Sequence, residues 1–203
     1  MFDCRHRPLR LPDELAKQLA AAYSEPQRAY HNAAHIADVL GWFDRVVDEL
    51  GWLEPAEVYV AIVFHDAVYQ PGAKDNEARS AKWARKAKLS ADERVDATLV
   101  DRDRVAELIE ATARHGHVAT ADHDTGLFLD CDMAIVGASA EAFDAYDRAI
   151  ALEYKHVPPD AYREGRKAFL QGLLARPRIF VSDYFHRRLD AQARANLTRA
   201  LAA

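Results

Sequence analysis

Residues 31–50 read HNAAHIADVLGWFDRVVDEL, and the spacing of their apolar side chains decides the fold class. The apolar residues recur at intervals of three and four: Ile36, Val39, Leu40, Phe43, Val46, Val47 and Leu50. This spacing places them on one face of a long amphipathic helix. We expect five of them to line the hydrophobic core: Ile36, Val39, Phe43, Val46 and Leu50.

The same helical spacing continues along the chain. Pro55 suits the first turn of a buried helix that continues through VYVAIVFHDAVY, residues 58–69. Further helices are predicted for residues 76–89, a short segment opened by the capping box of Ser90 and Glu93, about 105–115, about 140–155, 159 to about 177, and roughly 186–202. Residues 116–126 are expected to form a polar loop. No segment alternates long enough for a sheet, so the sequence predicts one all-α domain over residues 1–203.

Composition excludes several classes of protein. The 203 residues are 50% hydrophobic, which is enough for one core, and the two cysteines form neither a disulfide framework nor a CxxC site. The net charge of −5, without a basic run, disfavours binding to long nucleic acids or anionic membranes. The start lacks the apolar core of a secretory signal and no stretch is apolar enough to span a bilayer, so we expect a cytoplasmic protein. Motifs of the GxGxxG, GxxxxGK[ST], HExxH and GxSxG types are absent.

Three clusters of histidine and aspartate remain. His31 and His35 are expected on the same side of one helix, because they are four residues apart. His65-Asp66 ends the most apolar segment of the chain. In FLDCDMAIVG, residues 128–137, two aspartates at 130 and 132 have no basic neighbour between Leu127 and Gly137.

Each cluster alone also fits an ordinary structural role. A core histidine, an Asp–His hydrogen bond between helices or an aspartate helix cap would explain them one at a time. Taken together, two imidazoles and two carboxylates suit a divalent metal such as Mn, Fe, Co or Ni, with positions left for water. Two carboxylates in one apolar run also raise each other's pKa unless a cation is present.

The order His…His-Asp…Asp resembles that of the HD superfamily of metal-dependent phosphohydrolases, which are all-α. The stretches AYHNAAHI, VFHDAVY, DNEARSA, ATARHGH and FLDCDMAIVGAS are similar to those of a bacterial group of predicted HD phosphohydrolases. The resemblance covers roughly residues 23–200 and implies an HD-type helical bundle. It also implies four metal ligands: His35, His65, Asp66 and Asp132. Asp132 matches the family's last aspartate better than Asp130, although Asp130 stays an alternative.

The resemblance also allows Mg as the metal. It further implies roles for residues around the metal. Asp66 would hold the attacking water, and Glu77 either accepts its proton or is a helix-terminal acid. His31 and His115 would orient ligands, contact phosphate or bind a second metal. The candidate phosphate clamps are Arg28, Arg79, Arg114, Arg163 and Arg166. Four residues form the expected substrate contacts: Arg28, His31, His115 and Arg166. Tyr30, Tyr69 and Tyr154 are expected in the core or at the rim of the site.

The leading functional hypothesis is hydrolysis of a phosphate ester, in a nucleotide or another small phosphorylated metabolite, by a metal-activated water. An HD-type di-iron oxygenase is one alternative, for which His31, His115 and His117 would supply additional ligands. A non-catalytic metal- or nucleotide-binding regulator is another, disfavoured because all four ligand positions are occupied. A homodimer is compatible with the sequence.

Overall fold

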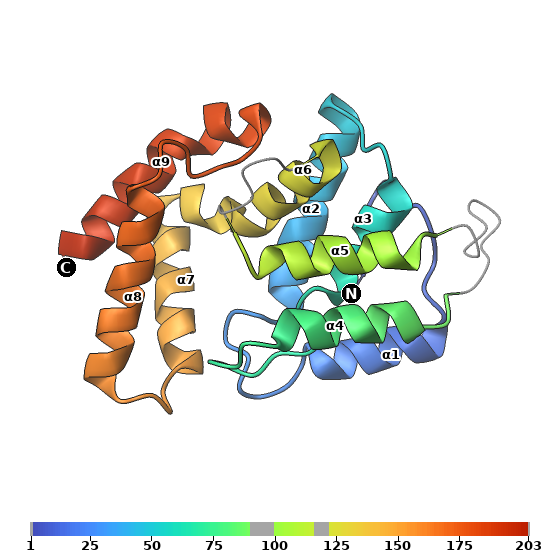
Figure 1. Cartoon of the computed structure of the whole chain (residues 1–203), viewed down its shortest axis with the longest axis horizontal. Coiled ribbons are helices and arrows are strands. Elements are labelled where there is room, and N and C mark those ends of the chain that lie inside the picture. The colour runs from blue at the N-terminus through green and yellow to red at the C-terminus, as the bar shows by residue number, and fades with distance from the viewer. Residues whose placement is uncertain (1, 90–99, 116–121, 203) are drawn as a thin grey trace.

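The structure, a computed structural model, describes residues 2–89, 100–115 and 122–202, and within these ranges all regular structure is helical (Figure 1). The elements are α1 (Asp13–Ala22), α2 (Ala33–Glu49), α3 (Pro55–Phe64), α4 (Asn76–Lys86), α5 (Arg102–Thr112), α6 (His123–Met133), the 3-10 helix η1 (Ala134–Gly137), α7 (Ala140–Glu153), α8 (Pro159–Leu174) and α9 (Asp183–Ala202). The all-α prediction is confirmed. None of the helices in this part of the chain is both long and apolar enough to cross a membrane.

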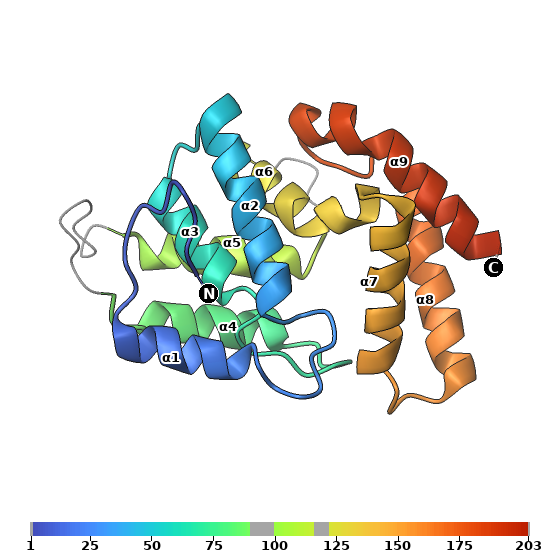
Figure 2. The same ribbon diagram turned by 180° about the vertical axis from the view of Figure 1, so that it is seen from behind.

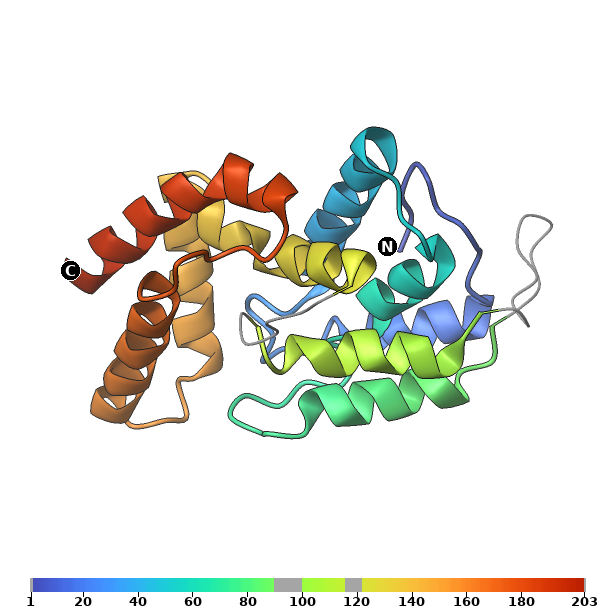
Figure 3. The same ribbon diagram turned by 45° about the horizontal axis from the view of Figure 1, so that its top comes forward.

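The helices form two groups that meet at α6 and η1. Helices α1 to α6 pack together at one end, while α7 and α8 lie side by side at the other, with α9 across them (Figures 1 and 3). Helix α7 begins shortly after η1, and the view from behind shows α7 and α8 side by side with α9 crossing them (Figure 2). Helix α9 packs on both η1 and α8. The end of α6 therefore faces both groups.

The core is built around α3 and the apolar face of α2. Every residue of α3 from Val58 to Phe64 is buried, which confirms a buried helix in place of a strand. The expected face of α2 is buried from Ile36 to Val46, but Leu50 is 49% exposed and its assignment to the core was wrong. Leu50 follows the last residue of α2, and Gly51 turns the chain with a positive φ of 85°, so Leu50 leaves the buried stripe.

Two predicted helix boundaries were wrong for a local reason. The side chain of Asn32 accepts a hydrogen bond from the backbone N–H of Ala34 at 2.8 Å and caps α2, so His31 lies in the turn before the helix. Helix α3 ends at Phe64, not near residue 69. Beyond it, the buried Arg28 donates to the carbonyls of Asp66 and Ala67 at 2.6 and 3.1 Å. The HD dipeptide therefore stands at the C-terminal end of α3.

Other helix boundaries in the structure also differ from the predicted ones. Residues 123–126, expected as loop, form the first turn of α6, because Asp122 accepts from the N–H of Thr125 at 3.0 Å. Helix α4 ends at Lys86, and Arg102 donates to the carbonyls of Ala84 and Ala87 at that end. Helix α1 was not anticipated. The predicted capping box of Ser90 and Glu93 lies outside the described residues.

Gly137 should be essential for the packing of η1 on α9. A Cβ atom built at Gly137 would lie 2.6 Å from the Cβ of Leu189 and 2.9 Å from its carbonyl oxygen. Gly137→Ala should therefore lower the free energy of unfolding by about 1–3 kcal/mol, measured by urea denaturation. Gly172→Ala is the control, since its Cβ meets no atom within 4 Å and alanine favours helix by about 0.5–1 kcal/mol. Equal stability of the two variants would contradict the close packing.

Candidate metal centre

Three separate segments bring the predicted ligands together. His35 lies on the buried face of α2, His65 and Asp66 follow the last turn of α3, and Asp132 is near the end of α6. The histidines are 3% and 1% exposed. The side chains of Asp66 and Asp132 are 16% and 13% exposed, so the carboxylates lie on the more open side of the cluster.

The ligand atoms have the spacing of a coordination shell. The Nε2 atoms of His35 and His65 are 3.2 Å apart, and Oδ1 of Asp132 is 3.0 Å from the first and 3.4 Å from the second. Oδ2 of Asp66 lies 3.5 and 3.2 Å from the same two nitrogens. Ligands about 2.1 Å from one ion are roughly 3.0–3.4 Å from their neighbours. His35, His65 and Asp132 can therefore hold a metal ion, and Asp66 lies beside them.

Hydrogen bonds orient two of these ligands. Nδ1 of His65 is 2.8 Å from the carbonyl oxygen of Ile62, which assigns the proton to Nδ1 and leaves the Nε2 lone pair for a metal. Oδ2 of Asp132 is 2.8 Å from Nε2 of His115, while Oδ1 faces the cluster. His115 thus orients Asp132 from outside the ligand shell.

The electrostatics of the cluster favour a cation. Burial alone lowers the pKa of His65, but the charges of Asp66 and Asp132 outweigh it and raise that pKa well above its ordinary value. Burial likewise opposes ionisation of both carboxyls, yet the surrounding histidines hold their pKa values below the ordinary range. A metal must displace the imidazolium proton, so its binding weakens as the pH falls.

Asp130 and Asp132 have different partners. Asp130 is buried and accepts hydrogen bonds from the N–H groups of Val181 and Ser182, both at 2.7 Å, and from the Ser182 hydroxyl at 2.6 Å. Burial raises its pKa to about 6, although these bonds favour the ionised form. Asp130 therefore holds the segment leading into α9, while Asp132 joins the histidines.

A second cluster surrounds Glu153, which the sequence analysis missed. Its carboxylate accepts from the N–H groups of Tyr30 and His31 at 2.7 and 2.9 Å, and from the hydroxyl of Tyr69 at 2.7 Å. Nδ1 of His31 lies 2.7 Å from the same carboxylate. Burial lowers the pKa of His31, but Asp66 and Glu153 reverse this and raise it. Glu153 and Asp66 thereby favour the protonated form of His31 beside the candidate metal ligands.

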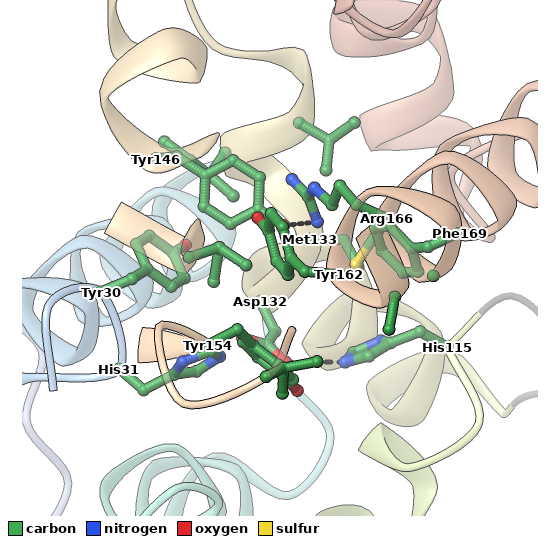
Figure 4. Close-up of a pocket in the computed structure, with 16 residues that line it drawn as sticks. Tyr30, His31, His115, Asp132, Met133, Tyr146, Tyr154, Tyr162, Arg166 and Phe169 are labelled. Carbon is green, nitrogen blue, oxygen red and sulfur yellow. Dashed lines mark hydrogen bonds and ion pairs between the residues drawn. The ribbon is translucent and has the colours of Figure 1, made fainter. Parts of the chain in front are cut away.

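A cavity of about 500 Å³ adjoins the cluster (Figure 4). Asp132, His31 and His115 line it, and the hydrogen bond between His115 and Asp132 crosses its wall. Helices α7 and α8 supply most of the rest, including Tyr146 and Arg166. Three of the four predicted substrate contacts thus share one cavity.

Arg28, the fourth predicted substrate contact, is buried beside the cluster and does not line the cavity. Its side chain is almost wholly buried, between the rings of Tyr23 and Tyr69 at 5.3 and 5.4 Å. Its guanidinium donates to the carbonyls of His31 and Asp66. Arg28 fixes the backbone around the cluster and is not among the residues that line the cavity.

The remaining candidates make no hydrogen bond or ion pair with the four predicted ligands among the described residues. Arg79 and Arg163 are exposed and pair with Asp75 and Asp160 within their own helices or caps, and Arg114 is exposed as well. Glu77 is partly buried in the first turn of α4. Within the described ranges no hydrogen bond or ion pair joins Glu77 to the four ligands. His117 lies outside those ranges.

Comparison of the chain with protein-family models, with curated proteins and with solved structures finds no match. The likeness to the HD superfamily therefore rests on the motif residues alone. The geometry of the cluster is an independent observation, because it comes from the arrangement of three helical segments.

Substitution of the two neighbouring aspartates should separate metal binding from stability. Asp132→Asn should weaken binding of Mn²⁺ by at least about tenfold, because a ligand loses its charge. Asp130→Asn should retain the metal but lower the free energy of unfolding by about 1–3 kcal/mol, since its buried hydrogen bonds to Val181 and Ser182 are disturbed. Isothermal titration and urea denaturation measure the two effects. Loss of metal in Asp130→Asn alone would reverse the assignment.

Glu153 should contribute to stability in a pH-dependent way. Burial raises its pKa, but the bonds from His31, Tyr69 and Tyr30 outweigh burial and lower it from 4.5 to about 2. A depressed carboxyl pKa stabilises the fold above pH 4.5, and this contribution is lost as the pH falls towards 2.

Between pH 5 and pH 3, metal-free wild type should therefore lose about 1–2 kcal/mol more stability than Glu153→Gln. Urea denaturation at the two pH values measures this difference. Parallel losses in both proteins would show that Glu153 is not held as an ionised group.

Proposed function

We propose that this protein is a metal-dependent phosphohydrolase that acts on a small phosphate ester. The observation that carries the proposal is the convergence of His35, His65, Asp66 and Asp132, with neighbouring ligand atoms 3.0–3.5 Å apart, beside an open cavity. Two neutral and two anionic donors suit a divalent ion of intermediate hardness. An ion held by these residues would supply Lewis acidity and a water activated for attack on a phosphate ester at neutral pH.

Asp66 is suited to position the attacking water. Its carboxylate is the more exposed of the two, and its main-chain carbonyl is fixed by Arg28 at 2.6 Å. A carboxylate in this position accepts a hydrogen bond from water and orients it towards phosphorus. The same group balances the charge of the ion.

His31 is suited to donate a proton to the leaving oxygen. Glu153 occupies its Nδ1 and stabilises the imidazolium, so Nε2 is the nitrogen left to donate. The ring lines the cavity next to Asp132. Arg166 also lines the cavity, where its guanidinium pairs with Asp147.

The proposal is tested by metal analysis of the purified protein, followed by a panel of phosphate esters with Mn²⁺, Co²⁺, Ni²⁺, Fe²⁺ or Mg²⁺. Release of phosphate that depends on added metal is the expected result. Dioxygen consumption with a bound pair of iron ions, and no phosphate release, would instead favour an oxygenase. Metal binding without turnover of any ester would favour a regulator.

Asp66→Asn should lower the rate of ester cleavage at saturating metal by at least about 10²-fold, because the substitution keeps the shape and removes the charge that orients water. Asp75→Asn is the matched control on an exposed carboxylate outside the cluster, and its rate should stay near wild type. Glu77→Gln tests the remaining candidate: a loss equal to that of Asp66→Asn assigns proton acceptance to Glu77. Turnover near wild type in Asp66→Asn would contradict the mechanism.

A further inference from the structure

The walls of the cavity beside the metal centre are mainly aromatic and aliphatic. Among the described residues, most of those lining the cavity are aromatic or aliphatic, and five of them carry rings: Tyr30, Tyr146, Tyr154, Tyr162 and Phe169. Asp132 is the carboxylate in this lining and Arg166 is its arginine, and the described lining contains neither lysine nor a side-chain amide. The polar groups of this lining are the tyrosine hydroxyls, two imidazoles, Asp132 and Arg166, and the larger apolar part of the wall suits an aromatic group better than a polyol.

Arg166 does not provide an uncompensated positive charge. Its Nε donates to Oδ1 of Asp147 at 2.8 Å, and the guanidinium lies over the rings of Tyr146 and Phe169 at 5.0 and 5.1 Å. The side chain is 12% exposed. A guanidinium neutralised by a carboxylate and stacked on two rings forms a flat wall, and it does not offer the free charge that a second or third phosphate needs.

Gly165 leaves space in this wall. It lies on the face of α8 that lines the cavity, one turn from Tyr162 and Phe169. A Cβ atom built there meets no other atom within 4 Å. Glycine in the interior of a helix costs about 1 kcal/mol relative to alanine, and here its effect is to keep the cavity open between aromatic side chains.

We infer that the cavity binds the organic part of a phosphate monoester with a single phosphate and a flat aromatic group, and this inference rests on the proposed function. The phosphate lies at the metal centre near His31 and Asp132. The aromatic group lies between the tyrosines and the Arg166 wall, where rings pack by offset or edge-to-face contact. Nucleoside triphosphates and sugar phosphates fit these walls poorly.

The test compares 2-naphthylmethyl phosphate with glycerol 3-phosphate. Both are monoesters of primary alcohols, so the comparison reports mainly on the organic group. Wild type should favour the naphthylmethyl ester in kcat/KM by at least about 30-fold, which is about 2 kcal/mol at 1.4 kcal/mol per factor of ten. A preference for glycerol 3-phosphate or for a nucleoside triphosphate would overturn the inference and leave the phosphohydrolase proposal standing.

Gly165→Leu fills the space in the cavity, and Gly172→Leu is its matched control. Both glycines lie within α8 with no atom near an added Cβ, but Gly172 is not among the residues that line the cavity. Gly165→Leu should lower kcat/KM for the naphthylmethyl ester at least tenfold and change glycerol 3-phosphate less than threefold. Gly172→Leu should change neither. Equal effects of the two variants would overturn the inference, and the smaller Gly165→Ala gives an intermediate loss should the leucine variant fold poorly.

A binding measurement tests the preference of the cavity for an aromatic group separately from the phosphohydrolase activity. Calorimetric titration with 2-naphthylmethylphosphonate, at saturating Mn²⁺, reports on the cavity without turnover. Binding to wild type and to Gly172→Leu, with at least tenfold weaker binding to Gly165→Leu, supports the inference even where no ester is cleaved. Binding that is unchanged in Gly165→Leu overturns it, whatever the protein hydrolyses.

Discussion

The metal centre depends on the attraction between two carboxylates, Asp66 and Asp132, and the pair of buried imidazoles that both of them face. Each lies within 3.5 Å of Nε2 of His35 and of His65. Carboxylates that are largely removed from water stay ionised when a cation lies beside them, and an imidazolium provides that cation until a metal replaces its proton. A metal that binds only the folded chain adds its binding free energy to the stability of the helices that supply the ligands.

The position of these charges explains why α3 ends where it does. A helix buried on every side cannot carry an ionised aspartate in its interior without a large desolvation cost. Ending at Phe64 places Asp66 at the edge of the core. The carbonyls of Asp66 and Ala67 then accept from Arg28 instead of from a following helical turn. The buried arginine thus satisfies the backbone of the segment that carries the acid.

Local sequence signals were sufficient to predict the fold class, the buried character of α3 and the first residues of α7 and α8, because these depend on neighbours within a few residues. These signals did not show which of the two aspartates, Asp130 or Asp132, joins the histidines. The partners of Asp130 are residues 181–182, and those of Asp132 come from α2 and from the residue after α3, which are far away in the sequence. Glu153 did carry a local signal, since it shares the inward face of α7 with Phe143 and Ile150. A carboxylate on an apolar helix face calls for a buried partner.

His31 and His115 looked equivalent in the sequence but differ in what they bind. Nε2 of His115 contacts Asp132, one of the proposed ligands, so a change at His115 would disturb that carboxylate. His31 bonds to Glu153, which is not one of the four ligands. Its imidazole can therefore give up and regain a proton while the ligand set stays intact. In the proposed reaction this difference makes His31 the acid and His115 the group that keeps Asp132 in place.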